Sequence, residues 1–530
     1  MIKNFIRVQL IERFRLSLIK ISRVLNKHNT IPVDFKKKKF LFNTQYIWTY
    51  SELEFMCAAQ LQSEGHEVII IICDGLPYSE REIFDLPKIK SYKSCSNRTI
   101  RYCNAYGLKY LKINSFLNAE DKNKAKELSL KNIDEISNFS KNNINLGDYA
   151  KRNHSHYFKG DIKPVGSFES IYRKAFESAY LIETSISNIL LKYKDYDLVT
   201  ANGKFIQTGI PAQLTKNAGN SFYSYEVFRQ GDCVLLDKDR YSLEQRMDDV
   251  WEELKTTSLD EHQLKRLYHS FDLQQKSTSL IEPLWDESRI DSDDEIISLL
   301  GIDLNKKVIA CYPNVYWDSV HMGMESVSKD LTSWLIDMIH FAKSNQDFQL
   351  IIRTHPAELK VAQIIQSKFT ISDSLHEVFE VMPSNVIIIE PKSNISSYSL
   401  ARIADANLVW NGTIGLELAL RGIKPVVIAD AHYANKGFTL DFLNLEDLEN
   451  YLVNIEDKPL VSPSEKRLLE IFCYHNRFNR RFNAPFYKGY WCYMFNYSHI
   501  RAGKNKVLDN MTGFFLDRNS CMEIGKFDFE

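Results

Sequence analysis

The chain has 530 residues, which is too many for one hydrophobic core, so we expect two or three domains. Hydrophobic residues make up 44% of the chain and aromatic residues 12%, which excludes an intrinsically disordered protein. The formal net charge of −1 excludes a protein that binds nucleic acid over its whole surface. No apolar run is long enough to span a bilayer, so we expect a cytoplasmic protein.

Residues 1–39 differ in composition from the rest of the chain. Eleven Lys or Arg face only Glu12 and Asp34, and apolar residues recur from Ile2 to Leu25 at roughly helical spacing. Such a basic amphipathic helix, followed by the lysine run 36–39, is suited to an anionic membrane surface, which would make the protein peripheral at the inner membrane. The alternative is a helix that packs on the first domain, with a solvated lysine run after it.

The first domain is expected to span residues 40–285. An apolar strand at 40–43, a helix at 51–64 that ends at Gly65, and a β-branched strand at 67–73 form a βαβ unit, which predicts a parallel sheet. A polar, helical stretch follows at 118–145. Strands at 197–200 and 221–225, with a helix between them, continue the same pattern. The acidic residues 286–305 are expected to be a linker.

A second series of strands is predicted at 308–312, 348–352, 386–389, 407–410 and 425–429, with helices between them. This alternation indicates a second Rossmann-like domain at residues 306–460. Residues 461–530 are expected to be helical and to pack back across both domains. The predicted fold class is therefore α/β, with two Rossmann-like domains facing each other across a cleft.

Polar residues follow the strand at 348–352, where open α/β sheets bind their ligands. These residues are Arg353, His355 and Glu358, with Pro356 forcing a turn among them. Arg353 and His355 are suited to neutralise a diphosphate. A His between Thr and Pro can also simply satisfy the turn, and that alternative stays open.

A loop of small polar residues follows the strand at 407–410 and opens a helix. It contains Asn411, Thr413 and Gly415, and free N–H groups at a helix N-terminus favour phosphate. Glu417 lies in the first turn of the helix, where it is placed either to bind ribose hydroxyls or to cap the helix. Together the two segments predict a nucleotide held between two strand ends, in a transferase that uses an activated sugar.

These strings resemble a known family, the capsule polysaccharide biosynthesis glycosyltransferases, which are distant relatives of bacterial Kdo transferases and of the CDP-glycerol glycerophosphotransferases of teichoic acid synthesis. The matching strings are YPNVYWDS at 312–319, RTHPAE at 353–358, SSYSL at 396–400, NGTIGLELALRGIKPVV at 411–427 and HYANKGFT at 432–439. Their order carries the resemblance more than any one string does. It covers about residues 40–455 and is weaker in the first domain.

The resemblance implies a GT-B fold with the acceptor in the first domain, a nucleotide-sugar donor in the second, and no metal or other cofactor. It implies that these residues bind the donor: Arg353, His355, Glu358, Ser396, Ser397, Asn411, Thr413, Gly415 and Glu417. Asn411 departs from the family pattern, in which Ser is common at this position. The absence of an Asp-x-Asp pair at a predicted strand end also indicates chemistry without a divalent metal.

Inverting sugar transfer needs a base that deprotonates the acceptor hydroxyl. The candidates are Asp74, after the strand at 67–73, Glu226, and Glu52 or Glu54 at the start of the first helix. We expect Glu54 to be a solvated helix residue, and Asp74 has turn capping as its alternative role. His355 is a further catalytic candidate, as a stabiliser of the leaving nucleotide.

Three functions stay open at this point. The first is an inverting glycosyltransferase that extends a capsular or other surface polysaccharide or its lipid-linked acceptor. The second is transfer of a polyol phosphate from a CDP-activated donor. The third is a catalytically inactive GT-B subunit that scaffolds a capsule-synthesis complex. We also expect deletion of residues 1–30 to leave transfer to a soluble acceptor analogue largely intact and to reduce sedimentation with anionic vesicles.

Overall fold

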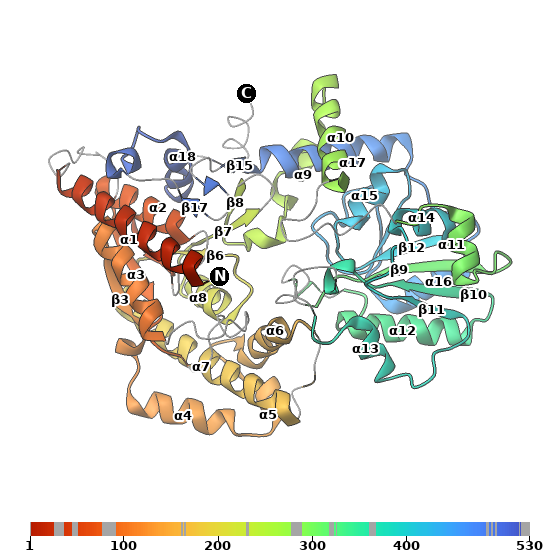
Figure 1. Ribbon diagram of the computed structural model, residues 1–530, viewed down its shortest axis with the longest axis horizontal. Helices are drawn as coiled ribbons and strands as arrows, with labels where there is room; N and C mark the ends of the chain where they lie inside the picture. Colours follow the sequence, from red (N-terminus) through yellow and green to blue (C-terminus); the bar gives the residue numbers. More distant parts are fainter. Residues whose placement is uncertain are drawn as a thin grey trace.

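The computed structural model describes residues 2–25, 37–44, 51–76, 92–160, 163, 166–228, 233–276, 289–316, 318, 323–324, 326–359, 367–483, 487–488, 491–492, 496–518 and 520. Within these residues the chain forms two α/β domains, each built on one large sheet with helices on both faces (Figure 1). The predicted fold class, with two Rossmann-like domains, is confirmed.

The sheet of the first domain has the order β15-β8-β7-β6-β1-β2-β3. Its parallel part consists of β1 (Lys39–Phe42), β2 (Glu67–Ile72), β3 (Lys109–Lys112), β6 (Asp197–Ala201) and β7 (Phe222–Phe228). Two antiparallel strands, β8 (Cys233–Lys238) and β15 (Arg481–Asn483), extend one edge. The βαβ unit predicted at 40–73 is present, whereas β3, β8 and β15 were not predicted.

Helices cover both faces of this sheet. One face packs against α1 (Ile2–Leu25), α2 (Ser51–Ser63), α3 (Tyr92–Tyr106) and α18 (Lys506–Phe515). The other face packs against α6 (Leu146–Phe158), α7 (Glu169–Lys192) and α8 (Ile206–Asn217), with α4 (Ala119–Ser129) and α5 (Ile133–Ser137) outside them. The predicted helical stretch 118–145 is thus two short helices and a hairpin of β4 (Ser140–Lys141) and β5 (Ile144–Asn145).

The sheet of the second domain is entirely parallel, in the order β11-β10-β9-β12-β13-β14. Its strands are β9 (Lys307–Tyr312), β10 (Phe348–Arg353), β11 (Val386–Ile389), β12 (Ala406–Val409), β13 (Val426–Val427) and β14 (Leu440–Asp441). One face packs against α12 (Leu331–Ser344), α13 (Ile371–His376) and α16 (Leu445–Val453). The other packs against α11 (Asp293–Leu300), α14 (Ser397–Ile403) and α15 (Ile414–Leu420). The expected linker at 286–305 therefore contains a helix that packs on the second sheet.

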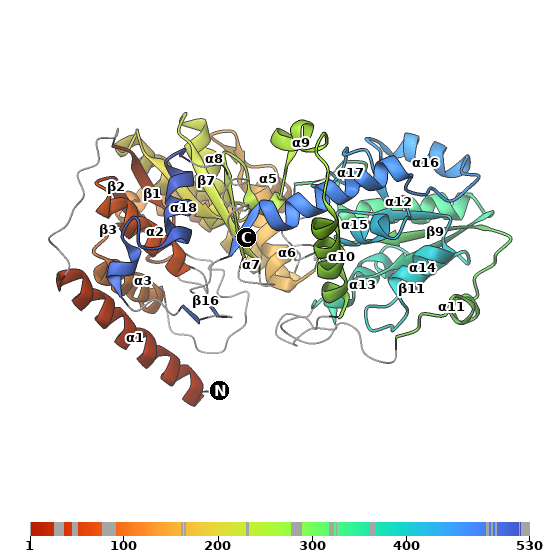
Figure 2. The ribbon, with the colours of Figure 1, turned by 90° about the horizontal axis from the view of Figure 1, so that it is seen from above.

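The chain passes between the two domains more than once. Helices α9 (Asp248–Leu254) and α10 (Glu261–Lys276) share a hydrophobic cluster with α15 and α17 (Pro463–Tyr474), although they lie within the range expected for the first domain. After α17 a π-helical turn (His475–Asn479) leads into β15 on the first sheet, and α18 then packs on α2. Figure 2 shows α17 running between the domains. The C-terminal segment thus packs on both domains, as predicted, but contributes a strand as well as helices.

The remaining described elements are short. They are the hairpin of β16 (Tyr487–Lys488) and β17 (Trp491–Cys492) and the 3-10 helices Ile113–Phe116, Gly166–Phe168, Ser242–Glu244, Pro356–Glu358 and Tyr497–Ile500. Among the residues described, no helix is both long and apolar enough to cross a membrane.

Candidate functional site

The strand order of the second sheet reverses between β9 and β12, and open α/β sheets bind ligands at such a switch point. Asn314 follows β9 and Asn411 follows β12. The Nδ2 of Asn314 donates to the Oδ1 of Asn411 at 3.1 Å, and both side chains are buried. The segments that follow β10, β11 and β12 begin at the same edge of the sheet, because these strands are parallel. The structure therefore brings the predicted donor segments together around this asparagine pair.

His355 occupies the N-cap of the 3-10 helix that follows β10. Its Nδ1 accepts a hydrogen bond from the backbone N–H of Ala357 at 3.1 Å, so the ring proton lies on Nε2. Burial, with a smaller effect of Arg353, lowers the pKa of His355 to about 4. The imidazole is therefore neutral at physiological pH. It is suited to donate a hydrogen bond from Nε2 and unsuited to act as a base.

Arg353 is almost fully buried and turns its guanidinium toward backbone carbonyls. Nη1 donates to the carbonyl oxygens of Thr354 at 2.8 Å and Glu390 at 3.2 Å, and Nη2 donates to Ser393 at 3.2 Å. Burial lowers the pKa of Arg353 to about 10. These bonds fix the loop between β11 and α14, so Arg353 positions that loop. Its direct contact with a donor stays a prediction.

Glu358 is fully buried and faces the start of α13. Its Oε1 accepts a hydrogen bond from the backbone N–H of Ile371 at 3.0 Å. Burial raises the pKa of Glu358 to about 8, so the carboxyl group is mainly protonated at neutral pH. This contact gives Glu358 a structural role, and its predicted role in donor binding stays a prediction.

The pKa of Glu358 predicts how stability depends on pH. Because the folded-state pKa is raised from 4.5 to about 8, the native state holds the proton longer than the unfolded state. The free energy of unfolding should fall as pH rises through this window. Glu358→Gln, which cannot ionise, should flatten that decline and be more stable than the wild type above pH 8, by about a few kcal/mol. Urea unfolding over a pH series measures the difference. The exposed Glu380→Gln serves as control, and a wild-type decline unchanged in Glu358→Gln would contradict the assignment.

Ser396 and Ser397 lie at the start of α14, after β11. The Oγ of Ser396 accepts from the backbone N–H of Ser399 at 3.3 Å, which caps the helix. The carbonyl oxygen of Ser397 accepts from the hydroxyl of Tyr312 at 3.3 Å, and both serines are buried. Their contacts are therefore those of a helix N-terminus, and the predicted phosphate or base contact is untested.

Thr413 and Glu417 form a polar cluster at the first turn of α15. The Oγ1 of Thr413 donates to the Oε1 of Glu417 at 3.1 Å, and the hydroxyl of Tyr398 donates to the other carboxylate oxygen. The guanidinium of Arg421 lies over the Tyr398 ring, 3.9 Å from its centroid. Glu417 is thus already hydrogen-bonded on both oxygens, by side-chain hydroxyls and not by backbone N–H groups of α15, so these bonds are not those of a helix cap. Ribose binding would have to compete with these bonds.

Gly415 is required by a close contact with Tyr433. A Cβ at Gly415 would lie 2.4 Å from the Tyr433 hydroxyl, which donates to the carbonyl oxygen of Gly412 at 2.7 Å. Tyr433 belongs to the HYANKGFT string and fastens the loop after β13 onto the loop after β12. Sequence reasoning quoted this string without assigning Tyr433 a role.

The first sheet has its own switch point, between β1 and β6. Asn43 follows β1, and its Nδ2 donates to the Thr200 hydroxyl of β6 at 3.0 Å. The next residue, Thr44, donates its hydroxyl to the carboxylate of Glu54 in the first turn of α2. The hydroxyl of Tyr225, on β7, donates to the other oxygen of Glu54 at 2.8 Å.

Glu54 is buried, so the expectation of a solvated residue was wrong. Every residue from 51 to 61 is buried, because α2 is enclosed by the sheet, α3 and α18. Burial raises the pKa of Glu54 from 4.5 to about 7, although the bonds from Thr44 and Tyr225 act to lower it. A carboxyl group that titrates near neutral pH at the carboxyl end of a sheet is suited to proton transfer.

Asp74 and Glu226, two of the other predicted bases, also accept hydrogen bonds within the first domain. The Oδ1 of Asp74 accepts from the backbone N–H of Asn114 at 2.9 Å and from its side-chain amide at 3.1 Å, so it binds the 3-10 helix after β3 and not its own turn. Glu226 lies on β7 and accepts from the backbone N–H of Val227 at 3.1 Å. A catalytic role for either residue stays a prediction.

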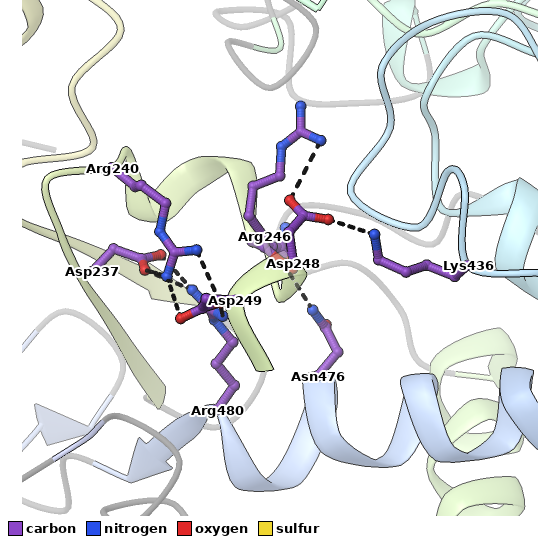
Figure 3. Close-up of polar contacts among 9 residues, drawn as sticks. Asp237, Arg240, Arg246, Asp248, Asp249, Lys436, Asn476 and Arg480 are labelled. Carbon is purple, nitrogen blue, oxygen red and sulfur yellow. Dashed lines mark hydrogen bonds and ion pairs between the residues drawn. The ribbon is translucent and has the colours of Figure 1, made fainter. Parts of the chain in front are cut away.

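Ion pairs connect the domains beside the site (Figure 3). Arg246, which precedes α9, pairs with Asp430. Figure 3 shows Asp248 between Arg246, at 3.8 Å, and Lys436. Asp430 and Lys436 flank Tyr433, so the loop that fastens Gly412 is itself held by the segment leaving β8. The same close-up shows buried Arg480 bound to Asp237 on β8 at 2.6 and 2.7 Å. Sequence reasoning missed this cluster, since its residues come from segments far apart in the chain.

A second contact joins α6 of the first domain to the second domain. Lys151 lies 3.8 Å from Asp330, and the backbone N–H of Lys368 donates to the carbonyl oxygen of Phe158 at 3.2 Å.

Among the described residues no three His, Cys, Asp or Glu side chains are grouped to hold a metal ion. Independence of metal and of other cofactors is untested.

Comparisons with known proteins were made by sequence and by structure. No family model matches the sequence, and no curated protein sequence matches it. Among solved structures, the Thermosulfurimonas dismutans KpsC beta Kdo 2,7 transferase is similar at 14% identity and a TM-score of 0.30, covering 55% of this chain and 79% of the other. The beta Kdo 2,4 transferase of Thermosulfurimonas dismutans KpsC is similar at 12% identity and a TM-score of 0.31, covering 52% of this chain and 78% of the other. A putative UDP-N-acetylglucosamine 2-epimerase from Listeria monocytogenes is similar at 9% identity and a TM-score of 0.25, covering 92% of this chain and 98% of the other.

Proposed function

We propose that the protein is an inverting glycosyltransferase. It transfers a sugar from a nucleotide-activated donor to a hydroxyl of a capsular or other surface polysaccharide, or of its lipid-linked acceptor. The observation that carries the proposal is the buried carboxyl group of Glu54, with a pKa of about 7, in a two-domain fold whose second sheet gathers polar residues at its switch point. The order of the motif strings supports the same reaction class.

Glu54 acts as the general base in this proposal. A base is most effective when its pKa lies near the working pH, because it is then largely deprotonated and still basic enough to take the proton. Asp74 and Glu226 stay alternative bases. All three carboxylates already accept hydrogen bonds, Asp74 and Glu226 from backbone N–H groups and Glu54 from the hydroxyls of Thr44 and Tyr225. The acceptor hydroxyl would approach the end of β1, donate its proton to Glu54 and attack the anomeric carbon of the donor.

The donor lies at the switch point of the second sheet. The neutral His355 donates from Nε2 to a phosphate oxygen of the nucleotide, where negative charge develops as the sugar leaves. Asn314 and Asn411 define the floor of the site between β9 and β12. Arg353 fixes the adjacent loop from behind.

Two other functions make different demands on the same residues. A polyol phosphotransferase would attack phosphorus and release CMP, so identification of the leaving nucleotide separates it from a sugar transferase. An inactive scaffold would have no use for Glu54, whose burial raises its pKa and costs stability above pH 7.

Thermal unfolding with CMP, CDP, UDP and GDP tests the donor site. One nucleotide should stabilise the protein, by about 2.7 kcal/mol at a hundred times its Kd, because it binds the folded state alone. His355→Ala should weaken that nucleotide about tenfold or more, through loss of the hydrogen bond to a charged group. The exposed His262→Ala is the matched control. If none of the four nucleotides raises the melting temperature, or if His355→Ala binds as the wild type does, the donor site is wrongly placed.

A further inference from the structure

Helix α1 is fixed to the first domain by one of its faces. Arg15 pairs with Glu52 on α2, and Arg98 on α3 donates two hydrogen bonds to Glu12 at 2.9 and 2.7 Å. Leu16 and Ile19 are buried in the same interface. This face of the helix is therefore part of the first domain, which agrees with the alternative of a packing helix.

The opposite face of α1 is apolar and exposed. Ile11, Phe14, Ile21 and Leu25 have exposed fractions between 41 and 77%, and Leu18 between them is half-buried. Their spacing of three and four residues places all five along one side of the helix. Single exposed apolar residues are ordinary, but a continuous stripe of this kind marks a docking surface.

Positive charge borders this stripe. Arg13 and Lys20 are exposed on the side of the helix between the stripe and the buried face. Arg101 on α3 lies close enough to Arg13 and Arg98 for both to lower its pKa, after the larger effect of burial and against the opposing effect of Glu12. Glu12 already binds Arg98. An apolar stripe near exposed guanidinium and ammonium groups matches the boundary of an anionic lipid bilayer, where apolar acyl chains lie beneath anionic head groups.

Two lysines of the run at 36–39 are paired with carboxylates, and Lys36 lies outside the described residues. Lys38 pairs with Asp517 at 2.7 Å, and Lys39 lies 3.4 Å from Asp195. The expectation that residues 36–39 add to a membrane-facing charge therefore does not hold for these two lysines. Figure 2 shows α1 along the outer side of the first domain, with its N-terminal end standing away from both sheets.

We propose that the stripe Ile11, Phe14, Leu18, Ile21 and Leu25, with Arg13 and Lys20 beside it, docks the protein onto an anionic lipid surface. The stripe enters the boundary between head groups and acyl chains, and the cations lie over lipid phosphates. This inference rests on the proposed function in one respect, since it places the acceptor domain where a lipid-linked acceptor would be. Arg15 connects α1 to Glu52, two residues before Glu54, so the docked helix and the proposed base share one rigid unit.

Sedimentation of the full-length protein with lipid vesicles tests the proposal. The wild type should sediment with vesicles of phosphatidylcholine and phosphatidylglycerol and much less with phosphatidylcholine alone. Raising salt from 0.1 M to 1 M should release it, because the Debye length shortens from about 10 Å to about 3 Å. Phe14→Asp/Ile21→Asp should abolish binding. Arg13→Ser/Lys20→Ser should reduce the partition coefficient by about fivefold or more.

Leu299→Asp/Val381→Asp is the matched control, because both residues are exposed apolar side chains on the second domain. It should bind as the wild type does, and all variants should keep the wild-type melting temperature. Three results would overturn the proposal: no wild-type binding at low salt, equal loss in the control, or a vesicle-free dimer that Phe14→Asp/Ile21→Asp dissociates. The assay contains no nucleotide and the nucleotide assay contains no lipid, so failure of one leaves the other standing.

Discussion

Glu54→Gln should reduce turnover by about 10²- to 10⁴-fold, the usual contribution of a general base, while the protein stays folded. Wild-type kcat/KM should rise with pH through about 7 and then level off, because the carboxyl group accepts a proton only when ionised. In the variant this acidic limb should disappear along with most of the rate. Nucleotide release, followed over a pH series with donor and acceptor present, measures both effects.

Stability separates a chemical role of Glu54 from a structural one. Its folded-state pKa is raised from 4.5 to about 7, so its ionisation reduces stability progressively as pH rises through that window. Glu54→Gln should therefore unfold at the wild-type temperature or above it at pH 8, even though its activity is lost. The matched changes Asp74→Asn and Glu226→Gln should cost far less activity. If the kcat/KM of Glu54→Gln still rises with pH through about 7, a residue other than Glu54 is the general base.

Most parallel strands were predictable, because each of these is a short apolar run bounded by turn residues; the parallel edge strands β3 and β14 were not. Strand β10, residues 348–353, is buried throughout and reads as apolar apart from Gln349 and its last residue. Strand β3 escaped prediction because it lies at the sheet edge, where Lys109 and Tyr110 are exposed and no apolar pattern is needed. Strand β15 pairs with β8 across more than 240 residues of sequence, so its partner is visible only in the fold.

Parts of the candidate site could likewise be predicted from the sequence, and other parts could not. The segments after β10 and β12 could be found from the sequence, because a polar cluster after an apolar strand is a local pattern. The buried state of Glu54 could not, since it depends on segments distant in sequence. Helix α2 is covered by α18, where Met511 contacts Cys57 at 3.9 Å and Thr512 accepts from Gln60 at 3.1 Å. An acid in a first helical turn otherwise looks like a solvated residue that favours the helix dipole.

The buried ion pair between Arg15 and Glu52 should be the most costly contact of α1 to break. The two side chains meet through both guanidinium nitrogens and both carboxylate oxygens, each only 5% exposed, and the Tyr106 hydroxyl also donates to Glu52. Burial acts to lower the pKa of Arg15, but Glu52 holds it above its ordinary value. Arg15→Met leaves the carboxylate buried without its partner, which should cost about 3–5 kcal/mol of unfolding free energy.

The double variant Arg15→Met/Glu52→Gln should recover much of that loss, because it removes the unpaired charge. Lys131→Met, which breaks the exposed pair with Glu135, is the control and should cost about 1 kcal/mol or less. Urea unfolding of the four proteins measures these differences.

The ion pair between Arg15 and Glu52 also bears on truncation of the chain. Deletion of residues 1–30 removes Arg15 and should destabilise the start of α2, including Glu54. If Arg15→Met unfolds like the Lys131 control, α1 is only loosely attached and the truncated protein should remain stable.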